Sequence, residues 1–185
     1  MFVKVCGITD IVCIDWAIEL GYDAVGVVLY KNSKRYCPPP YAAGLAKYAR
    51  NRIKTVAVSV AFKDVADVRE EFDYVQVYEP ARTEHLIYAA KKRPLEDLQI
   101  SGRDFEFFLY DASQGQGRLS DFPGWLRDYR DKLIIAGGLK PGNVKKIIEK
   151  VKPFGVDVST GVEKKDRKDY ELMRAFIAEV RNAKM

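Results

Sequence analysis

Three residues at or just after predicted strand ends carry side chains that can move protons or bind anions. Cys6 closes the first apolar run of the chain, Asp111 closes a later one, and Arg35 lies in the loop after the second run. A thiolate and a carboxyl group are proton-transfer groups, and a guanidinium group can hold a carboxylate through two parallel hydrogen bonds. Together these side chains predict acid–base chemistry on a small anionic substrate.

The first run, FVKVC, indicates which way each of its side chains points. Side chains of a strand alternate between its two faces, so Val3 and Val5 are expected on one face. Lys4 and Cys6 are expected on the other, with Cys6 last, at the strand's carboxyl end. Gly7 follows directly, and its lack of a side chain lets the chain turn without obstructing a ligand.

The same alternation assigns faces in two later runs. Leu109 and Asp111 share a face of FFLYD, and Asp157 and Ser159 point together in GVDVSTG. If the strands close into a barrel, the first and last strands become neighbours. We therefore expect Lys4 to pair with Asp157 inside the barrel, where each charge compensates for the desolvation of the other.

Two glycine-bearing stretches each follow a late strand: AGGLKPGN (136–143) and VSTGVE (158–163). Backbone N–H groups in such loops form anion cradles, and loops after the last two strands of a barrel are a common phosphate site. The residues predicted to bind phosphate there are Gly137, Gly138, Ser159, Thr160 and Gly161.

Short β-branched runs alternate with amphipathic segments along the whole chain. The predicted strands are 2–6, 24–29, 54–60, 74–78, 86–90, 105–110, 132–136 and 155–158. The predicted helices are 10–20, 40–50, 63–72, 142–151 and 168–181, with Asp10 capping the first and Pro141 at the entry of the fourth.

Eight strands that each precede a helix or loop predict parallel βα units and a (β/α)8 TIM barrel. With 185 residues the barrel must be compact, and we expect short or missing helices around residues 79–104. No linker interrupts the pattern, so residues 1–185 are expected to form a single domain. The alternative is an open doubly wound sheet, but no GxGxxG follows the first strand.

Composition limits the class of protein and its partners. The net charge of +5 and a pI of about 9.0 suit either nucleic acid or a small anion, and the basic runs at 91–93 and 164–168 are read as solvated surface. No apolar run is long enough to span a membrane, and no signal-peptide core is present. Three cysteines without a CxxC or His/Cys cluster predict neither a disulfide scaffold nor a metal site, which favours the cytoplasm.

Six stretches together resemble the phosphoribosylanthranilate isomerase family of tryptophan biosynthesis. They span nearly the whole chain in the family's order: VKVCGIT (3–9), GYDAVGVVLYKNSKRY (21–36), VQV (75–77), LYD (109–111), IIAGGLKPGNV (134–144) and PFGVDVSTGVE (153–163).

The resemblance implies a single (β/α)8-barrel isomerase domain that needs no cofactor. It implies an Amadori rearrangement of N-(5-phosphoribosyl)anthranilate, with Asp111 as the general acid that opens the ribose ring and Cys6 as the general base at C2′. It also implies that Arg35 holds the anthranilate carboxylate and that the two late glycine loops hold the phosphate. It leaves open whether a histidine-pathway aminoaldose is also a substrate, and the sequence does not indicate an oligomeric state.

The chain departs from the family pattern in two places. It reads VQVYE where the family usually has VQLHG, so Tyr78 replaces a histidine. The sequence leaves open whether Tyr78 lines the pocket. The segment GQGRLSDFPGW (115–125) replaces a glycine-rich GGTGKxFDW, and we assign it no substrate contact. His85, Cys13 and Cys37 are interpreted as structural or incidental.

Other functions remain as alternatives at this point. Another phosphate-binding barrel, such as a sugar-phosphate epimerase, would need paired carboxylates or several histidines, and the chain has one histidine. A nucleic-acid-binding protein would need a contiguous basic face, whereas the lysines here are interleaved with acids. A barrel that binds phosphate without turnover is the last alternative.

Overall fold

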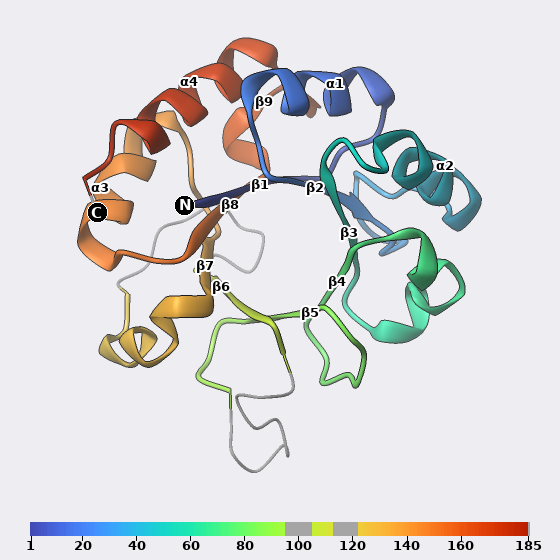
Figure 1. Ribbon diagram of the computed structural model, residues 1–185, viewed down its shortest axis with the longest axis horizontal. Coiled ribbons are helices and arrows are strands. Elements are labelled where there is room, and N and C mark those ends of the chain that lie inside the picture. The colour runs from blue at the N-terminus through green and yellow to red at the C-terminus, as the bar shows by residue number, and fades with distance from the viewer. Residues whose placement is uncertain (95–104, 113–121, 185) are drawn as a thin grey trace.

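The computed structural model describes residues 1–94, 105–112 and 122–184. Eight parallel strands form a closed barrel in chain order, and helices lie outside it (Figure 1). The strands are β1 (Phe2–Cys6), β2 (Ala24–Val28), β3 (Lys54–Val58), β4 (Tyr74–Val77), β5 (Leu86–Ala90), β6 (Phe107–Asp111), β7 (Leu133–Ala136) and β8 (Gly155–Val158). Because β8 pairs in parallel with β1, the predicted (β/α)8 TIM barrel is confirmed.

In the described residues, three α-helices and several shorter elements connect the barrel strands, and a fourth α-helix follows β8. The α-helices are α1 (Ile11–Leu20), α2 (Pro39–Ala49), α3 (Pro141–Val151) and α4 (Tyr170–Arg181). The 3-10 helices are η1 (Phe62–Asp64), η2 (Ala66–Glu71), η4 (Gly124–Lys132) and η5 (Thr160–Val162), and β9 (Glu163–Lys164) pairs with β10 (Arg167–Lys168) as a hairpin. None of the helices in the described residues is long and apolar enough to cross a bilayer.

Local sequence signals account for the ends of the α-helices. The Asp10 side chain accepts a hydrogen bond from the Cys13 N–H at 2.9 Å, which caps α1 as predicted. Gly21 ends the same helix at φ 80°, a backbone angle that glycine adopts without strain. Pro141 occupies the first position of α3, where its missing N–H has no helical partner to lose.

Alternation along the strands builds two separate cores. Val3 and Val5 face outward and join the apolar layer between the barrel and its helices, as predicted. The barrel interior is a second cluster. At its amino-terminal end Phe2, Phe107 and Phe154 stack with ring centroids 4.9 to 5.8 Å apart. These rings fill that end of the barrel, so a substrate pocket can open only at the carboxyl ends of the strands.

One predicted helix differs from the structure, and one segment expected to lack a helix does lack one in the described residues. The helix expected over 63–72 is the pair of 3-10 helices η1 and η2; its buried residues Val65 and Val68 are three apart, and residues at this spacing align in a 3-10 helix. Between β4 and β5 there is a loop without a helix (Figure 1), as expected for the first part of 79–104, and residues 95–104 lie outside the described chain.

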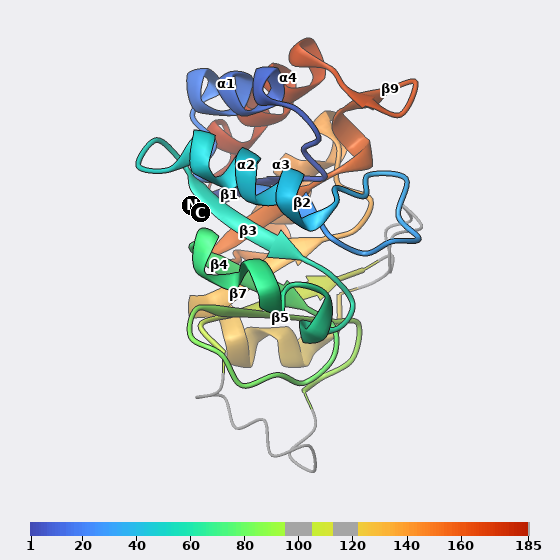
Figure 2. The same ribbon diagram turned by 90° about the vertical axis from the view of Figure 1, so that its right-hand side faces the viewer.

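The loop after β2 and the β9–β10 hairpin reach out from the same end of the barrel. Figure 2 shows both at the end toward which the strand arrows point, away from the two termini. An ion pair joins them at the surface, because Lys34 Nζ lies 3.5 Å from Asp166 Oδ2. The two segments therefore lie against each other at the carboxyl ends of the strands.

Candidate active site

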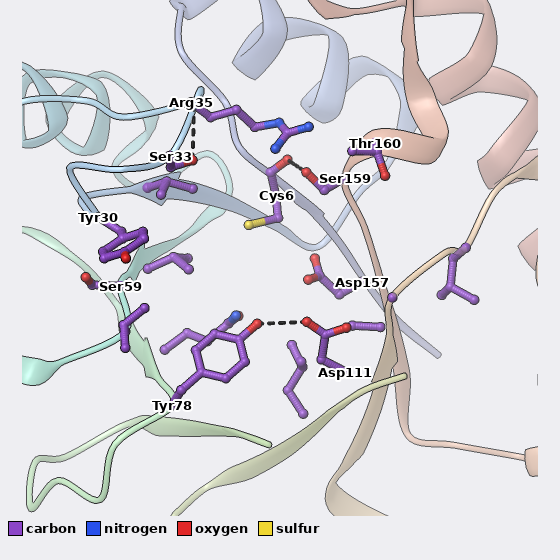
Figure 3. Close-up of a pocket in the computed structure, with 18 of the residues that line it drawn as sticks. Cys6, Tyr30, Ser33, Arg35, Ser59, Tyr78, Asp111, Asp157, Ser159 and Thr160 are labelled. Atoms are coloured by element: carbon purple, nitrogen blue, oxygen red, sulfur yellow. Dashed lines mark hydrogen bonds between the residues drawn. The ribbon is translucent and has the colours of Figure 1, made fainter. Parts of the chain in front are cut away.

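A cavity of about 270 Å³ opens at the carboxyl ends of the strands. Most of the residues singled out from the sequence line it, and Figure 3 shows ten of the lining residues by name. The predicted site residues in the lining are Cys6, Arg35, Asp111, Gly137, Gly138, Asp157, Ser159 and Thr160. Lys4 lies beneath the cavity, fully buried, and Gly161 lies behind its wall.

Cys6 and Asp111 face the same cavity from different strands. Cys6 ends β1 and is 8% exposed; Asp111 ends β6 and is 5% exposed. In Figure 3 the two side chains lie on opposite sides of the pocket with Asp157 between them. A substrate in this cavity would therefore have a thiol on one side and a carboxyl group on the other.

Tyr78 binds the Asp111 carboxyl group directly. Its hydroxyl donates to Asp111 Oδ2 at 2.9 Å, and its ring packs against the barrel interior (Figure 3). Burial and the adjacent Asp111 charge raise the pKa of Tyr78, so the phenol keeps its proton and remains a donor. The residue that replaces the family's usual histidine thus lines the pocket.

The predicted pair of Lys4 and Asp157 is present inside the barrel. Lys4 Nζ lies 3.0 Å from Asp157 Oδ1, with the lysine side chain fully buried. Burial would lower the pKa of Lys4, but Asp157 and, after it, Cys6 together outweigh burial and raise that pKa. Gly26 makes the space for this arrangement, since a Cβ there would lie 3.0 Å from Cys6 Sγ and 3.1 Å from Lys4 Nζ.

Burial and three nearby charges set the pKa of the Cys6 thiol, whose direction of shift the sequence does not indicate. Burial raises the pKa of the Cys6 thiol above its ordinary value, although the positive charges of Lys4 and Lys168 act in the opposite direction and the Asp157 charge acts with burial. The thiol form is therefore favoured in the structure. Two buried cations nevertheless lie close enough to stabilise a thiolate when one forms.

Gly7 makes room for the arginine. The Arg35 side chain crosses the backbone at Gly7, where a Cβ would lie 2.2 Å from Arg35 Cδ. Gly7 also has a φ of 79°, which side chains disfavour. Arg35 reaches the pocket wall, where its Nε and Nη2 donate to the two carboxylate oxygens of Glu163 at 2.7 and 2.6 Å.

The two glycine loops pack against each other at the rim. Gly137 and Gly138 have φ of 81° and 71° and line the pocket. Gly161 touches the first loop, because a Cβ on it would lie 1.8 Å from the Leu139 carbonyl oxygen. Ser159 is held by a 3.0 Å hydrogen bond from its hydroxyl to the Cys6 carbonyl. The predicted anion cradle is thus continuous with the strand that carries Cys6.

Sequence reasoning missed three polar residues at or near the pocket. Gln76 lines the cavity at 3% exposure, and among the described residues its Oε1 has no hydrogen-bond partner. Glu163 and Lys168 form a buried pair on the β9–β10 hairpin. The reading of 164–168 as solvated surface is wrong for Lys168, because hairpin pairing turns its side chain inward toward Glu163.

The remaining residues noted in the sequence lie outside the pocket lining. Cys13 and Cys37 are buried in the outer core, and His85 is exposed, with Nδ1 2.8 Å from Glu106 Oε2. Residues 115–121 of the altered glycine-rich segment lie outside the described chain, and Trp125 packs on the outer core.

Comparison with known families gives a match over almost the whole chain. A family profile described as "N-(5'phosphoribosyl)anthranilate (PRA) isomerase" matches residues 3–179. A protein of that name from Pyrococcus abyssi is 33% identical over 210 residues, covering 98% of this chain and 99% of its own. One from Thermotoga neapolitana is 34% identical over 196 residues, covering 95% and 96%.

Solved structures agree in fold. The crystal structure of phosphoribosyl anthranilate isomerase from Thermotoga maritima superposes with a TM-score of 0.81 at 30% identity, covering 98% of this chain and 99% of its own. A structure of such an isomerase in complex with reduced 1-(o-carboxyphenylamino)-1-deoxyribulose 5-phosphate has a TM-score of 0.79 at 31% identity, with the same coverage.

Proposed function

The chain belongs to the N-(5′-phosphoribosyl)anthranilate isomerase family, and we propose that it carries out the family's reaction with Cys6 and Asp111 as its proton-transfer pair. The reaction is the Amadori rearrangement of N-(5-phosphoribosyl)anthranilate to 1-(2-carboxyphenylamino)-1-deoxyribulose 5-phosphate, in tryptophan biosynthesis. It is an internal oxidation and reduction of aldose–ketose type, so the enzyme is an intramolecular oxidoreductase.

One observation carries the assignment of roles. Cys6 and Asp111 line the same cavity from β1 and β6, while Arg35 and the two glycine loops line its mouth. The substrate has a carboxylate at one end, a phosphate at the other and the reacting sugar between them. Groups that can bind its anionic ends therefore lie in the same cavity as the groups that transfer protons, as positioning for catalysis requires.

The proton transfers follow from this placement. Asp111 donates a proton to the ribose ring oxygen, the C1′–oxygen bond breaks, and a protonated imine forms. Cys6, as the thiolate, removes the proton from C2′, and the released electron pair forms a C1′–C2′ double bond while the imine nitrogen becomes neutral. The enolamine then loses its hydroxyl proton and gains one at C1′, which leaves the ketone. The imine itself accepts the electrons.

The raised pKa of Cys6 is compatible with this role because the substrate helps. A proton at C2′ beside a protonated imine is far more acidic than an ordinary C–H, so a small thiolate fraction suffices. Lys4 and Lys168 favour that thiolate electrostatically. Tyr78 fixes Asp111 Oδ2 and so orients the acid toward the cavity.

Binding is divided among the remaining polar groups. Arg35 holds the anthranilate carboxylate, and Gly137, Gly138, Ser159, Thr160 and Gly161 form the phosphate site. The buried Oε1 of Gln76 is an acceptor for a ribose hydroxyl, since an unpaired buried polar atom costs about 1–3 kcal/mol until a partner arrives. The partner is thus a small molecule rather than nucleic acid.

The proposal also covers the domain organisation and the location of the enzyme. Residues 1–185 act as one domain, supported by a barrel whose first and last strands pair. The enzyme works in the cytoplasm, supported by three cysteines that are all free and by a family of biosynthetic enzymes.

A fluorescence assay tests the proposal. N-(5-phosphoribosyl)anthranilate is generated in place, and loss of its fluorescence is followed with added enzyme. The Cys6→Ala and Asp111→Asn variants are expected to lower kcat by about 10²–10⁴-fold. Cys13→Ala removes an equally buried thiol outside the pocket and serves as the control. Wild-type protein without turnover would refute the function; turnover retained in both catalytic variants would refute the roles.

A further inference from the structure

A cluster of three charged residues extends from the pocket lining at Arg35 into the protein behind it. Glu163 accepts from Arg35 at 2.7 and 2.6 Å and from Lys168 Nζ at 2.5 Å. The exposed fractions of the side chains fall from 21% for Arg35 to 6% for Glu163 and 2% for Lys168. Arg35 is thus the outermost member and the one that lines the cavity.

The hairpin brings the two inner members together. Glu163 on β9 pairs in register with Lys168 on β10, and Lys168 Nζ also donates to the Ser159 carbonyl at 3.2 Å. Lys168 therefore ties the hairpin to the end of β8, and Glu163 presents both carboxylate oxygens to the guanidinium group. Arg35 reaches this partner only because Gly7 leaves room beside it.

The cluster holds Arg35 by one edge. Nε and Nη2 are bonded to Glu163, and among the described residues Nη1 has no partner. A planar guanidinium group held by two parallel hydrogen bonds is fixed in both position and plane. Its other edge is then oriented for a carboxylate arriving in the pocket.

Charge explains why the lysine is needed. An arginine paired with one glutamate alone has no net charge left to attract an anion. Burial lowers the pKa of Lys168, while the charge and hydrogen bond of Glu163 oppose that shift. With Lys168 protonated, the cluster of two cations and one anion keeps one net positive charge. Burial would raise the pKa of Glu163, but bonding to Arg35 and the charge of Lys168 lower it, so the carboxylate stays ionised.

We propose that Glu163 and Lys168 are positioning residues for Arg35: Glu163 fixes the guanidinium group, and Lys168 offsets the glutamate charge so that the pocket selects a substrate with a carboxylate. This inference rests on the proposed function, since it assigns the anthranilate carboxylate to Arg35. It adds a specificity-determining pair that the pocket lining alone does not include.

The test compares two substrates and two lysine variants. The substrates are phosphoribosylated anthranilate and phosphoribosylated anthranilamide, in which a neutral carboxamide replaces the carboxylate. Lys168→Met is expected to raise KM for the carboxylate substrate by about 10-fold or more, because a nearby buried charge is lost. Lys168 also favours the Cys6 thiolate, so any fall in kcat from that loss should be common to both substrates. The ratio of kcat/KM for carboxylate over carboxamide should therefore fall by about 10-fold. Lys165→Met removes a cation from the exposed turn of the same hairpin and should leave kcat and KM unchanged for both substrates.

Further variants keep the proposal falsifiable if Lys168→Met folds poorly, as judged by circular dichroism. Lys168→Arg retains the charge and should restore the carboxylate preference. Glu163→Ala removes both acceptors that hold the guanidinium group, so the ratio of kcat/KM for carboxylate over carboxamide should fall. Equal losses on both substrates in Lys168→Met, or an unchanged ratio in Glu163→Ala, would overturn the proposal. Both results compare variants with a wild-type enzyme that turns over, so a failure of this proposal leaves the proposed function standing, whereas absent wild-type turnover would refute the function itself.

Discussion

Lys4 Nζ lies 3.0 Å from Asp157 Oδ1, so an ion pair joins the first and last strands inside the closed barrel. The two residues are also direct register partners in the β1–β8 ladder. The pair lies beneath the pocket and beside Cys6, whose thiol responds to both charges. The same contact therefore closes the barrel and sets the electrostatic environment of the proposed base.

Removing one partner of this pair is expected to be costly for stability. Lys4→Met leaves the Asp157 charge buried without compensation, which should lower the free energy of unfolding by about 3–5 kcal/mol. The double variant Lys4→Met/Asp157→Leu removes both charges and should recover much of that loss. Urea denaturation of the three proteins measures the difference.

The matched control is the exposed pair of Lys54 and Asp73, whose atoms lie 2.9 Å apart at the barrel's outer edge. Lys54→Met should cost no more than about 1 kcal/mol, because solvent screens that pair. A Lys4→Met loss as small as the Lys54→Met loss would contradict the role given to burial.

Alkylation by iodoacetamide should report the raised pKa of Cys6. Because the thiolate is the reactive form, the rate is expected to rise with pH, with a midpoint above the ordinary thiol value of about 8.5. Lys4→Met should move the midpoint higher still, since the Lys4 charge favours the thiolate. Mass spectrometry of each peptide separates Cys6 from the other two thiols.

The other cysteines provide the internal reference. Burial raises the pKa of Cys13 to about 12 and that of Cys37 to about 11, and both lie outside the pocket lining. They should react more slowly than Cys6 at every pH. A Cys6 midpoint well below 8.5 would show that the two lysines outweigh burial, contrary to the assignment here.

Tyr78→Phe isolates the hydrogen bond to Asp111. The ring and its packing remain, but Asp111 Oδ2 loses a donor at 2.9 Å. A hydrogen bond to a neutral acid is worth about 0.5–1.5 kcal/mol, so we expect kcat to fall by up to about 10-fold with little change in KM. Tyr78→His supplies a ring donor of the kind usual in the family and should retain more activity than Tyr78→Phe. Equal activity in Tyr78→Phe and wild type would remove Tyr78 from the positioning of the acid.

Gly7→Ala should separate binding from chemistry. A methyl group there meets Arg35 Cδ at 2.2 Å and also occupies a φ of 79°. We expect Arg35 to be displaced, KM to rise and kcat to change much less, together with a loss of stability of about 1–3 kcal/mol from the strained backbone. Gly44→Ala, on the open face of α2, is the control, because a Cβ there meets nothing within 4 Å. A larger effect on kcat than on KM would place Gly7 nearer the chemistry than proposed.

Patterns local in the chain were sufficient for the barrel and for the facing of its strands. Alternation in FVKVC assigned Lys4 and Cys6 to the interior, and closure of eight strands in order made Lys4 and Asp157 neighbours. Alternation has a period of two and the barrel admits only one order of strands, so both inferences depend on few choices. The prediction of a helix over 63–72 was wrong in its type for the opposite reason. The conformation of a short connection depends on what it packs against, which the local pattern does not specify.

The pattern of residues was enough to predict the barrel, the cavity that Cys6 and Asp111 share, and the paired charges of Lys4 and Asp157. The folded chain was needed to show that Tyr78 bonds Asp111, that Gln76 Oε1 has no partner within the described residues, and that Lys168 is buried behind Arg35. The first group follows from periodicity along each strand. The second group depends on side chains that meet across the barrel, or across a hairpin whose paired residues are five positions apart. The spacing of residues within one segment does not predict which of these polar atoms forms a hydrogen bond.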